Sequence, residues 1–352
     1  MSKLFCAALA VVVLLAVGIS AEAVQYRIRD LGTLGGTTSY AYGINNSGQV
    51  VGYLFMADSS QHAFLWQNGS MTDLGTLREN YSTAFGVNDS GQIVGGFSTW
   101  DEYHAFLWQN GSMTDLGTLG GNYIRSCANA INNSGQVVGY SLTSSIDFRA
   151  FLWQNGSMTD LGTLGGTESW ANDINNSGWI AGCSRTSGGY DHAFLWQNGI
   201  MTDLGGTDSW ANAINNSGWI AGSSRTSGGY NHAFLWQNGS MTDLGTLGGY
   251  SRDSYANDIN DSGQVVGESY TSDGQYHAFL WQNGSMTDLG SLGGYSWATA
   301  INDNGWIAGY STDASGNSHA VLWEPVPEPS SILTLLCGIG SLGGAIVRRK
   351  VK

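Results

Sequence analysis

Short apolar segments alternate with turn residues along most of the chain, and the same series of segments recurs at a period of about 43 residues. The first complete series has four segments, which are residues 39–45, 49–53, 62–66 and 70–77. None of them is long enough, or periodic at 3.6 residues, to form a helix. Four short segments per unit predict four antiparallel strands, which is the content of one β-propeller blade.

The residues between the segments are those that turns require. Asn68-Gly69 separates two apolar segments, and both residues tolerate the positive φ of a type I′ hairpin turn. Asn46-Ser47-Gly48 provides a longer turn with glycine at its left-handed position. The pattern therefore predicts hairpins between consecutive strands.

Three sequence boxes repeat in a fixed order. The HAFLW box, with its variants RAFLW and HAVLW, begins at His62, His104, Arg149, His192, His232, His277 and His319. The IN(N/D)SG box and its variants begin at Ile44, Val87, Ile131, Ile174, Ile214, Ile259 and Ile301. The DLG box begins at Asp30, Asp73, Asp115, Asp160, Asp203, Asp243 and Asp288. One unit repeated seven times predicts a single closed array over residues 24–325 rather than two domains.

The alternation within the HAFLW box indicates what surrounds its strand. His62, Phe64 and Trp66 share one face. Ala63 and Leu65 share the other face. Neither face is polar, so each sheet is expected to be covered on both sides, as blades stacked around an axis are.

The two ends of the array predict how it closes. A DLG strand, residues 26–34, opens the array without a preceding HAFLW box, and a HAVLW strand, residues 319–323, ends it without a following DLG box. The first strand would supply the fourth strand of the last blade and so remove a free sheet edge. The prediction is an all-β, seven-bladed propeller of four-stranded antiparallel blades, closed by its N-terminal strand.

Residues 1–23 have the form of a secretory signal peptide. Lys3 precedes an apolar run over residues 4–19, and Ala21-Glu22-Ala23 matches an A-x-A cleavage site. The alternative is an uncleaved membrane helix, but the run is shorter than the ~20 apolar residues that span a bilayer.

Residues 326–352 carry three further elements in order. These are Pro327-Glu328-Pro329, the apolar and glycine-rich residues 332–347, and a basic end that begins with Arg348 and Arg349. The stretch resembles the PEP-CTERM sorting signal of Gram-negative bacteria, which includes a short transmembrane segment. The resemblance implies transient anchoring in the inner membrane, processing by an exosortase, and a final place at the cell surface or outside the cell. The basic end agrees with this orientation, because basic residues next to a membrane segment stay in the cytoplasm. The alternative is a plain C-terminal tail anchor.

The HAFLW boxes resemble the extracellular HAF-repeat family, named for the sequence found here at residues 62–64. The resemblance covers nearly all of residues 24–325 and implies an exported repeat protein with no established reaction. The departures are Arg149 for His, Val321 for Phe, Arg78-Glu79 for Gly-Gly, and the shortened residues 203–206.

The charge balance argues against one class of partner. The chain carries 13 Lys plus Arg against 27 Asp plus Glu, a formal net charge of −14, and residues 24–325 contain no lysine. Such a surface repels phosphate backbones, so nucleic acid is not an expected partner. Export would permit a disulfide between Cys127 and Cys183, although two free, partly buried thiols are the simpler interpretation.

Every histidine lies in a HAFLW box, eleven residues before the next DLG aspartate where one follows. With a two-residue turn, Phe64 would face Asp73, which places His62 diagonal to Asp73 on the same side. Such pairs suit catalysis or metal binding, but repetition in nearly every unit favours a structural hydrogen bond. The predicted pairs are His62–Asp73, His104–Asp115, His192–Asp203, His232–Asp243, His277–Asp288 and His319–Asp30.

No cofactor or metal is predicted. The Asn-Ser-Gly turns lack the spacing and the terminal glutamate of a calcium loop, and turn formation explains them. Asp173 and Asp258 are the acids within the first strands, where either could line the axis. Two isolated carboxylates in non-adjacent units are weak support for acid–base catalysis.

The distribution of aromatic residues gives the best lead to a binding site. One face of an up-and-down propeller would carry the invariant turns, and the other would carry variable connections such as residues 53–61. Most residues four positions before the IN box are aromatic. These positions are Tyr40, Thr83, Cys127, Trp170, Trp210, Tyr255 and Trp297, with Tyr190, Tyr230 and Tyr276 nearby. The rings suit stacking on sugars, and packing between blades is the alternative.

Two classes of function remain. The first is an exported binding or scaffold module, with extracellular polysaccharide as a possible ligand. The second is a propeller enzyme, such as a glycan hydrolase or lyase, which would need a unique polar cluster near the axis. Residues 170–199 and 210–239 are almost copies of each other. Near-identical units favour repeated weak contacts, so we expect binding and no catalytic residue.

Overall fold

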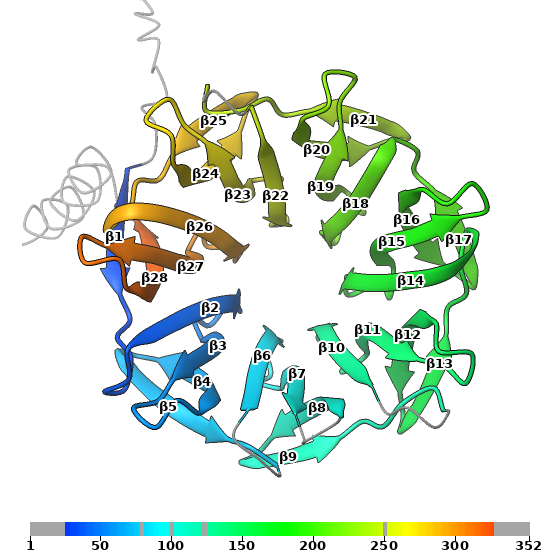
Figure 1. Ribbon diagram of the computed structural model, residues 1–352, viewed down its shortest axis with the longest axis horizontal. Coiled ribbons are helices and arrows are strands. Elements are labelled where there is room, and N and C mark those ends of the chain that lie inside the picture. The colour runs from blue at the N-terminus through cyan, green and yellow to red at the C-terminus, as the bar shows by residue number, and fades with distance from the viewer. Residues whose placement is uncertain (1–24, 78–80, 99–101, 121–124, 249–251, 327–352) are drawn as a thin grey trace, which may run out of the picture. The chain divides into compact units, whose positions relative to one another are not determined.

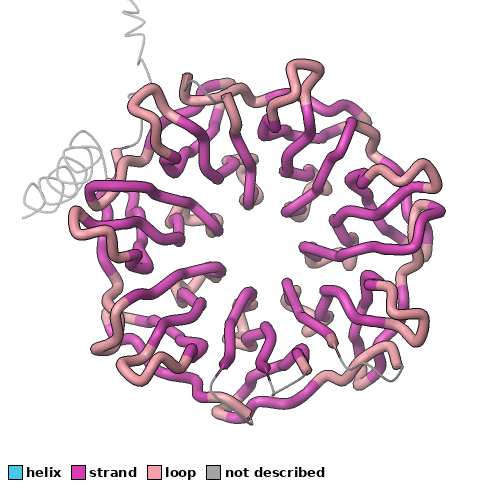
Figure 2. The backbone as a smooth tube through the Cα atoms, viewed as in Figure 1, coloured by secondary structure: helices cyan, strands magenta, loops and turns pink. Residues whose placement is uncertain are grey.

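The computed structural model describes residues 25–77, 81–98, 102–120, 125–248 and 252–326. Within these ranges the chain forms 28 strands joined by turns, with no helix (Figure 2). It follows that no helix of the described residues is long and apolar enough to cross a membrane. The predicted signal peptide and the predicted sorting signal, with its short transmembrane segment, lie outside the described residues apart from Val326.

The strands form five four-stranded sheets and one eight-stranded sheet. One four-stranded sheet joins both ends of the described chain and consists of β1 (Tyr26–Asp30), β26 (Gly293–Ile301), β27 (Ile307–Asp313) and β28 (Ser318–Pro325). The eight-stranded sheet consists of β2 (Thr38–Ile44), β3 (Val50–Phe55), β4 (Gln61–Gln67), β5 (Ser70–Gly75), β6 (Tyr81–Val87), β7 (Ile93–Ser98), β8 (Tyr103–Gln109) and β9 (Ser112–Asp115).

The other four sheets are each built from four consecutive strands. Two of them are β10 (Ser126–Ile131), β11 (Val137–Leu142), β12 (Phe148–Gln154) and β13 (Ser157–Asp160), and β14 (Gly165–Ile174), β15 (Ile180–Thr186), β16 (Asp191–Gln197) and β17 (Ile200–Asp203). The remaining two are β18 (Thr207–Ile214), β19 (Ile220–Arg225), β20 (Asn231–Gln237) and β21 (Ser240–Asp243), and β22 (Ser254–Ile259), β23 (Val265–Tyr270), β24 (Tyr276–Gln282) and β25 (Ser285–Asp288).

The sheets stand around a central axis, with the first strand of each series innermost (Figure 1). The eight-stranded sheet contains two antiparallel groups, β2–β5 and β6–β9, which meet through a single parallel pair between Gln61 and Tyr81. The architecture is a β-propeller of four-stranded antiparallel sheets, as the sequence predicted.

The turns have the predicted backbone conformations. Asn68 and Gly69 both have positive φ, 52° and 84°, as a type I′ hairpin requires. Gly48 closes the longer turn with φ 75°. Because the strands are antiparallel, these turns lie on one side of the ring, which we call the turn face. The opposite side carries connections such as Met56–Ser60, and we call it the variable face.

A glycine in each second strand allows the strands to approach closely. At Gly222 an added Cβ would lie 1.9 Å from the backbone oxygen of Trp210 and 2.9 Å from the ring of Phe234. Glycine is therefore the residue that fits between the first strand and the aromatic ring of the HAFLW box.

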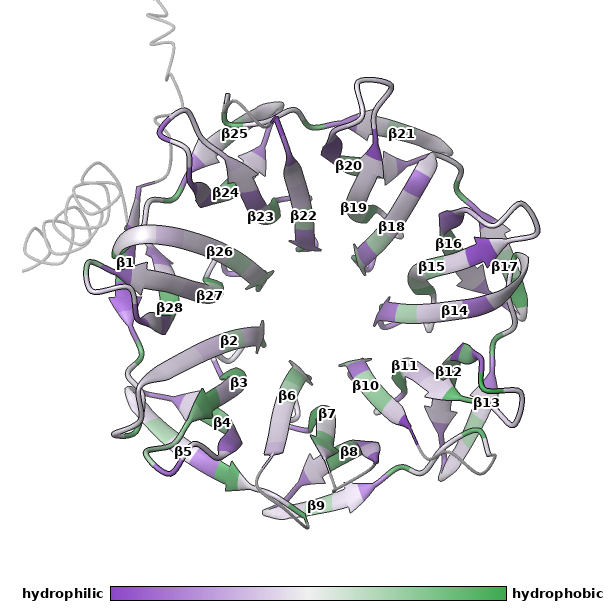
Figure 3. Ribbon diagram, in the orientation of Figure 1, coloured by the Kyte–Doolittle hydropathy of each residue, from purple (hydrophilic) through white to green (hydrophobic). Residues whose placement is uncertain are grey.

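The hydrophobic core lies between neighbouring sheets. Ala41, Val50 and Phe64 pack in one buried cluster with Ala308 and Leu322, which belong to the adjacent sheet. Figure 3 shows the hydrophobic segments within strands such as β3 and β7. Burial on both faces explains why neither face of the HAFLW strand is polar.

The expected pairing of the two ends of the array is present. β1 pairs antiparallel with β28, and Asp30 stands opposite Val321. The predicted extent of the first strand, to Leu34, was wrong. The strand ends at Asp30 because its Oδ1 accepts a hydrogen bond of 2.8 Å from the backbone N–H of Gly32, which has φ 86°.

Candidate functional site

The turn-face end of the axis is built from the residues that follow each innermost strand. The side chain of Asn175 is buried, and its Oδ1 accepts hydrogen bonds of 3.0 Å from the backbone N–H groups of Ser177 and Trp179. The first asparagine of the IN box therefore shapes its own turn, as sequence reasoning proposed for these loops.

The same asparagines also join the sheets to each other in a closed circle. Each Nδ2 donates to the backbone oxygen of the corresponding asparagine in the next unit, at 2.9–3.1 Å. The circle, which we call the buried asparagine ring, runs through Asn45, Asn88, Asn132, Asn175, Asn215, Asn260 and Asn302 and back to Asn45. Each asparagine accepts within its own turn through Oδ1 and donates to the next unit through Nδ2. An aspartate at this position could accept but could not donate.

A second circle is formed by the next residue of each box. Each backbone N–H donates to Oδ1 of the following unit at 2.8–3.0 Å. This exposed ring consists of Asn46, Asp89, Asn133, Asn176, Asn216, Asp261 and Asp303. Because the side chain needs only to accept, aspartate and asparagine both fit, which explains why the sequence has either residue at this position.

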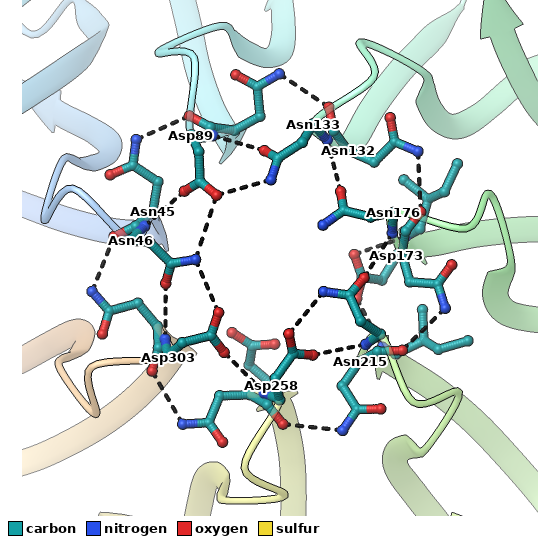
Figure 4. Close-up of a pocket in the computed structure, with 18 of the residues that line it drawn as sticks. Asn45, Asn46, Asp89, Asn132, Asn133, Asp173, Asn176, Asn215, Asp258 and Asp303 are labelled. Carbon is teal, nitrogen blue, oxygen red and sulfur yellow. Dashed lines mark hydrogen bonds between the residues drawn. The ribbon is translucent and has the colours of Figure 1, made fainter.

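The two rings surround a small polar cavity of about 170 Å³ (Figure 4). Asp173 and Asp258 lie deeper in this cavity than the exposed ring. Asp173 accepts hydrogen bonds of 2.8 Å from the backbone N–H groups of Ile174 and Ile214. The carboxylate therefore bridges two neighbouring sheets.

Asp258 makes the equivalent bridge to the N–H groups of Ile259 and Ile301, both at 2.7 Å. Burial, with a smaller effect from the charge of Asp173, raises the pKa of Asp258 to about 8. Burial also raises the pKa of Asp173. Both carboxyls line the axis, as the sequence suggested, and both act as inter-sheet acceptors.

The histidines of the HAFLW boxes contact the DLG aspartates on the outer strands. The Nδ1–Oδ distances are 2.7 Å for His62–Asp73, 2.9 Å for His192–Asp203, 2.7 Å for His232–Asp243, 2.8 Å for His277–Asp288 and 2.7 Å for His319–Asp30. His104 Nδ1 lies 2.9 Å from Asp115 Oδ2, and its Nε2 lies 3.1 Å from Glu102. Arg149 replaces histidine in one sheet, and its Nη1 lies 3.8 Å from Asp160.

The other aspartate oxygen in these pairs has a separate structural role. Oδ1 of Asp73 accepts from the backbone N–H of Gly75 at 2.7 Å, two residues further along. The aspartate thus shapes the end of its strand and orients the histidine at once. This geometry is consistent with a structural hydrogen bond that holds the third and fourth strands together.

The residues four positions before the IN box lie near the variable-face end of the axis, where several of them connect neighbouring sheets. The ring of Tyr40 lies 5.0 Å from that of Tyr310, and Trp170 lies 6.5 Å from Phe148. Asn231 donates a 3.1 Å hydrogen bond to the hydroxyl of Tyr255. At the equivalent positions Trp210 and Trp297 are half-buried, whereas Thr83 and Cys127 are buried.

Two further predicted aromatic residues are the most accessible of the set. Tyr190 and Tyr230 follow the Ser-Gly-Gly turns of two near-identical hairpins, where their exposed fractions are 57% and 38%. Tyr276 instead packs against Tyr270, with 5.0 Å between the ring centroids. The predicted residues therefore divide into inter-sheet contacts and exposed hairpin residues.

Part of this layer forms a continuous group of eight rings, which we call the aromatic cluster. Its members are Tyr40, Tyr42, Tyr53, Phe55, Phe85, Tyr295, Trp297 and Tyr310, linked by centroid distances of 4.8–5.8 Å. They come from β2, β3, β6, β26 and β27. Sequence reasoning identified Tyr40 and Trp297 but missed the other six rings, because their proximity depends on how the strands and the sheets pair.

Glu268 is a further residue that sequence reasoning missed. It stands opposite Tyr255 in the β22–β23 pair, where Tyr140 and Tyr310 occupy the equivalent positions in other sheets. Its Oε2 accepts a 2.6 Å hydrogen bond from Asn257. Burial raises the pKa of Glu268 to about 8, so the carboxyl is largely protonated at neutral pH. The only sequence signal was an acid where other units have Tyr, Gly, Cys or Ser.

Cys127 and Cys183 are both buried and unpaired. The Sγ of Cys127 lies 3.6 Å from Asn129 Oδ1. Burial raises the pKa of each thiol to about 12, so neither is a reactive thiolate at neutral pH. Among the residues that the structure describes, no group of three His, Cys, Asp or Glu side chains is placed to hold a metal ion.

Comparisons with known proteins show similarity of fold alone. No protein family matches the chain, and no curated protein matches it in sequence. A puromycin-hydrolysing peptidase from Mycobacterium tuberculosis is 11% identical with a TM-score of 0.55, over 86% of this chain and 53% of the peptidase.

Two other solved structures are similar at the same level. YCF48 bound to D1 peptide is 11% identical with a TM-score of 0.50, over 87% of this chain and 98% of that one. A putative TolB from Agrobacterium tumefaciens is 12% identical with a TM-score of 0.48, over 73% and 95% of the two chains. The chain spans about half the length of the peptidase. It shares a fold with the peptidase and with YCF48.

Proposed function

We propose that this chain is an exported propeller of seven blades that acts as a binding or scaffold module, with extracellular polysaccharide as its ligand class. Counting β2–β5 and β6–β9 as separate blades, beside the five four-stranded sheets, gives this number. Export rests on residues 1–23 and on the sorting signal in residues 326–352, whose processing would involve an exosortase.

The observation that carries the binding role is the aromatic cluster. Its rings share contacts across three neighbouring blades, while Tyr40, Trp297 and Tyr310 remain half-buried and Tyr295 is exposed. Aromatic faces that keep some accessible surface stack on the C–H faces of sugar rings, and a row of them suits an extended chain. Tyr190 and Tyr230 would add separate contacts from the β15–β16 and β19–β20 hairpins, across the ring from the aromatic cluster (Figure 1).

Glu268 gives this region a polar group that differs from those in the other blades. A carboxyl with a pKa of about 8 both donates and accepts hydrogen bonds at neutral pH, as sugar hydroxyls require. The chain as a whole has a net charge of −14, which disfavours strongly anionic polymers. The proposed ligand is therefore a neutral or weakly charged polysaccharide.

The test is affinity electrophoresis of the full chain through gels that contain neutral or anionic bacterial polysaccharides. One sugar–aromatic contact contributes about 1 kcal/mol, so Trp297→Ala should weaken retention about fivefold. Combined replacement of Tyr40, Trp297 and Tyr295 by alanine should abolish it, because affinity depends on several contacts.

Thermal unfolding of the same variants separates binding from packing. A loss of about 3–5 kcal/mol, as for a buried aromatic residue, with unchanged retention would show that the cluster is core and not a binding surface. Tyr190→Ala is the control for an exposed ring, since it should leave the unfolding temperature unchanged.

A second candidate function, glycan hydrolysis, is favoured by Glu268 alone. A carboxyl held protonated at neutral pH is the form that a general acid needs. The full chain would be assayed for new reducing ends with the polysaccharide that binds most tightly. Turnover that Glu268→Gln abolishes without loss of retention supports hydrolysis, and retention without turnover supports the binding module.

A further inference from the structure

A groove on the turn face combines two indole rings with several side-chain amides. It lies between the β18–β21 and β22–β25 sheets and has a volume of about 490 Å³. The residues that matter here are Trp219, Gln237, Gln264, Trp281, Gln282 and Asn283. We call this the Trp219 groove. Its volume falls within the ~300–1,000 Å³ range of small-molecule sites.

Trp219 occupies a position that is glutamine in four other units. Gln49, Gln92, Gln136 and Gln264 each donate from Nε2 to the glutamine that follows the HAFLW box of the same sheet, at 2.8–3.2 Å. With Trp219 at this position, Gln237 loses that partner. Among the described residues, no side-chain hydrogen bond satisfies the amide of Gln237, although this side chain is only half-exposed.

The neighbouring unit supplies the other half of the groove in a fixed orientation. Gln264 Oε1 accepts from Asn260 Nδ2 at 2.7 Å, and Gln264 Nε2 donates to Gln282 Oε1 at 2.9 Å. Gln282 Oε1 is occupied in this arrangement, so Nε2 is the part of the Gln282 amide that a ligand can accept from. Trp219 packs directly over Gly263, where an added Cβ would lie 2.6 Å from the indole. The indole of Trp219 is thereby held against the backbone of Gly263. A side chain at position 263 would occupy the space that the indole fills.

We infer that the Trp219 groove is a second carbohydrate site, specific for a neutral pyranose unit. The apolar C–H face of a pyranose matches the two half-buried indoles, and its hydroxyls match the amides of Gln237, Gln282 and Asn283, which donate and accept hydrogen bonds. No charged side chain lines the groove. Binding there is consequently insensitive to salt and to pH between 5 and 8, unlike recognition that involves Glu268. The inference shares the ligand class of the proposed function but not its site.

The chain itself provides the test substitution. Trp219→Gln restores the residue found at the same position in four other units, so the fold tolerates it while the groove loses an indole and Gln237 regains a partner. Trp306→Gln is the matched control. Trp306 stands at the same position in the last sheet, where the HAFLW glutamine is replaced by Glu324, which Arg27 and Arg29 hold in ion pairs.

Binding of neutral hexasaccharides of glucose, galactose and mannose to the full chain would be measured by saturation-transfer NMR and titration calorimetry. Trp219→Gln should weaken the binding of at least one of them about tenfold, the loss of one stacked ring and its hydrogen bond. Trp306→Gln should bind like the wild type, and Gln282→Ala should weaken binding with no change in unfolding temperature.

The binding results for these variants distinguish the second site from the aromatic cluster. Equal affinities for wild type and Trp219→Gln, or no hexasaccharide bound at millimolar concentration, would overturn the inference. If Trp297→Ala abolishes binding and Trp219→Gln does not, the proposed function stands and the second site fails. If Trp219→Gln weakens binding and Trp297→Ala does not, the second site stands and the aromatic cluster is core.

Discussion

His319 and Asp30 are 289 positions apart in the chain, yet Nδ1 of the histidine lies 2.7 Å from Oδ2 of the aspartate. The same contact occurs between His62 and Asp73 within a single hairpin, at the same distance. The junction of the two ends of the array therefore repeats the geometry of the His62–Asp73 hairpin. β1 completes its sheet with the bonding that a continuous chain would have made, which leaves no free edge on β28.

Removal of β1 is predicted to make the protein associate. Deletion of residues 26–30 exposes the backbone groups of β28 and leaves Glu324 without Arg27 and Arg29. An unpaired edge pairs with other molecules, so size-exclusion chromatography should show oligomers or aggregate. Asp73→Ala is the control, because it removes an equivalent His–Asp contact without exposing an edge. A monomeric deletion variant with the wild-type unfolding temperature would show that the closure is dispensable.

The two adjacent asparagines of one IN box are predicted to respond differently to the same substitution. Asn175→Asp removes the donor to the backbone oxygen of Asn215 and places a buried carboxylate beside that oxygen. The expected loss in the free energy of unfolding is about 2–4 kcal/mol. Asn176 uses Oδ1 to accept from the N–H of Asn133, which aspartate also does. Asn176→Asp should therefore change stability by less than about 0.5 kcal/mol.

Urea unfolding of the two variants at neutral pH provides the measurement. Equal losses for Asn175→Asp and Asn176→Asp would show that turn formation alone, rather than the buried asparagine ring, accounts for the first position. The comparison holds the charge change constant, so general electrostatic repulsion cannot produce the difference.

The IN box illustrates what sequence reasoning reached and where it stopped. Turn chemistry explained Gly48 and the side-chain acceptor of Asn175, because these interactions are local. The link from Asn302 to Asn45 joins residues 257 positions apart and exists only in a closed ring. One signal was visible: the first residue of the pair is always asparagine, whereas the second is either asparagine or aspartate.

The His–Asp pairs and the aromatic cluster show the same division. His62 and Asp73 are eleven residues apart and connected by one turn, so the register of a two-residue hairpin was enough to place them together. The contact between Tyr40 and Tyr310 depends on the junction of the first and last sheets. Glu268 was missed because the acids were sought in first strands, while strand pairing places this second-strand residue beside Tyr255.

The ends of the mature protein are predicted from the sequence. Signal-peptide cleavage should leave a mature protein that starts near Val24, and exosortase processing should remove the segment after the Pro327-Glu328-Pro329 box. Mass spectrometry of the protein from its native host would measure both ends. A chain that extends intact to Lys352 would favour a plain tail anchor, and Arg348→Ala with Arg349→Ala would then be expected to leave its length unchanged.

Two carboxyls near the axis are predicted to make stability decrease as pH rises. Burial raises the pKa of Asp258 from 3.8, and that of Glu268 from 4.5, to about 8 in both cases. Between these unfolded and folded values the folded state holds more protons than the unfolded chain, so the free energy of unfolding falls as pH rises and levels off above about pH 8. Asp258→Asn and Glu268→Gln remove one titration each. The free energy of unfolding of each variant, taken relative to that of the wild type, should therefore increase from pH 5 to pH 9. The lost acceptor adds a constant cost that does not affect this increase. The control Ser262→Ala should show no such increase. Urea unfolding at the two pH values measures this difference, and profiles parallel to the wild type would show that neither carboxyl titrates in this interval.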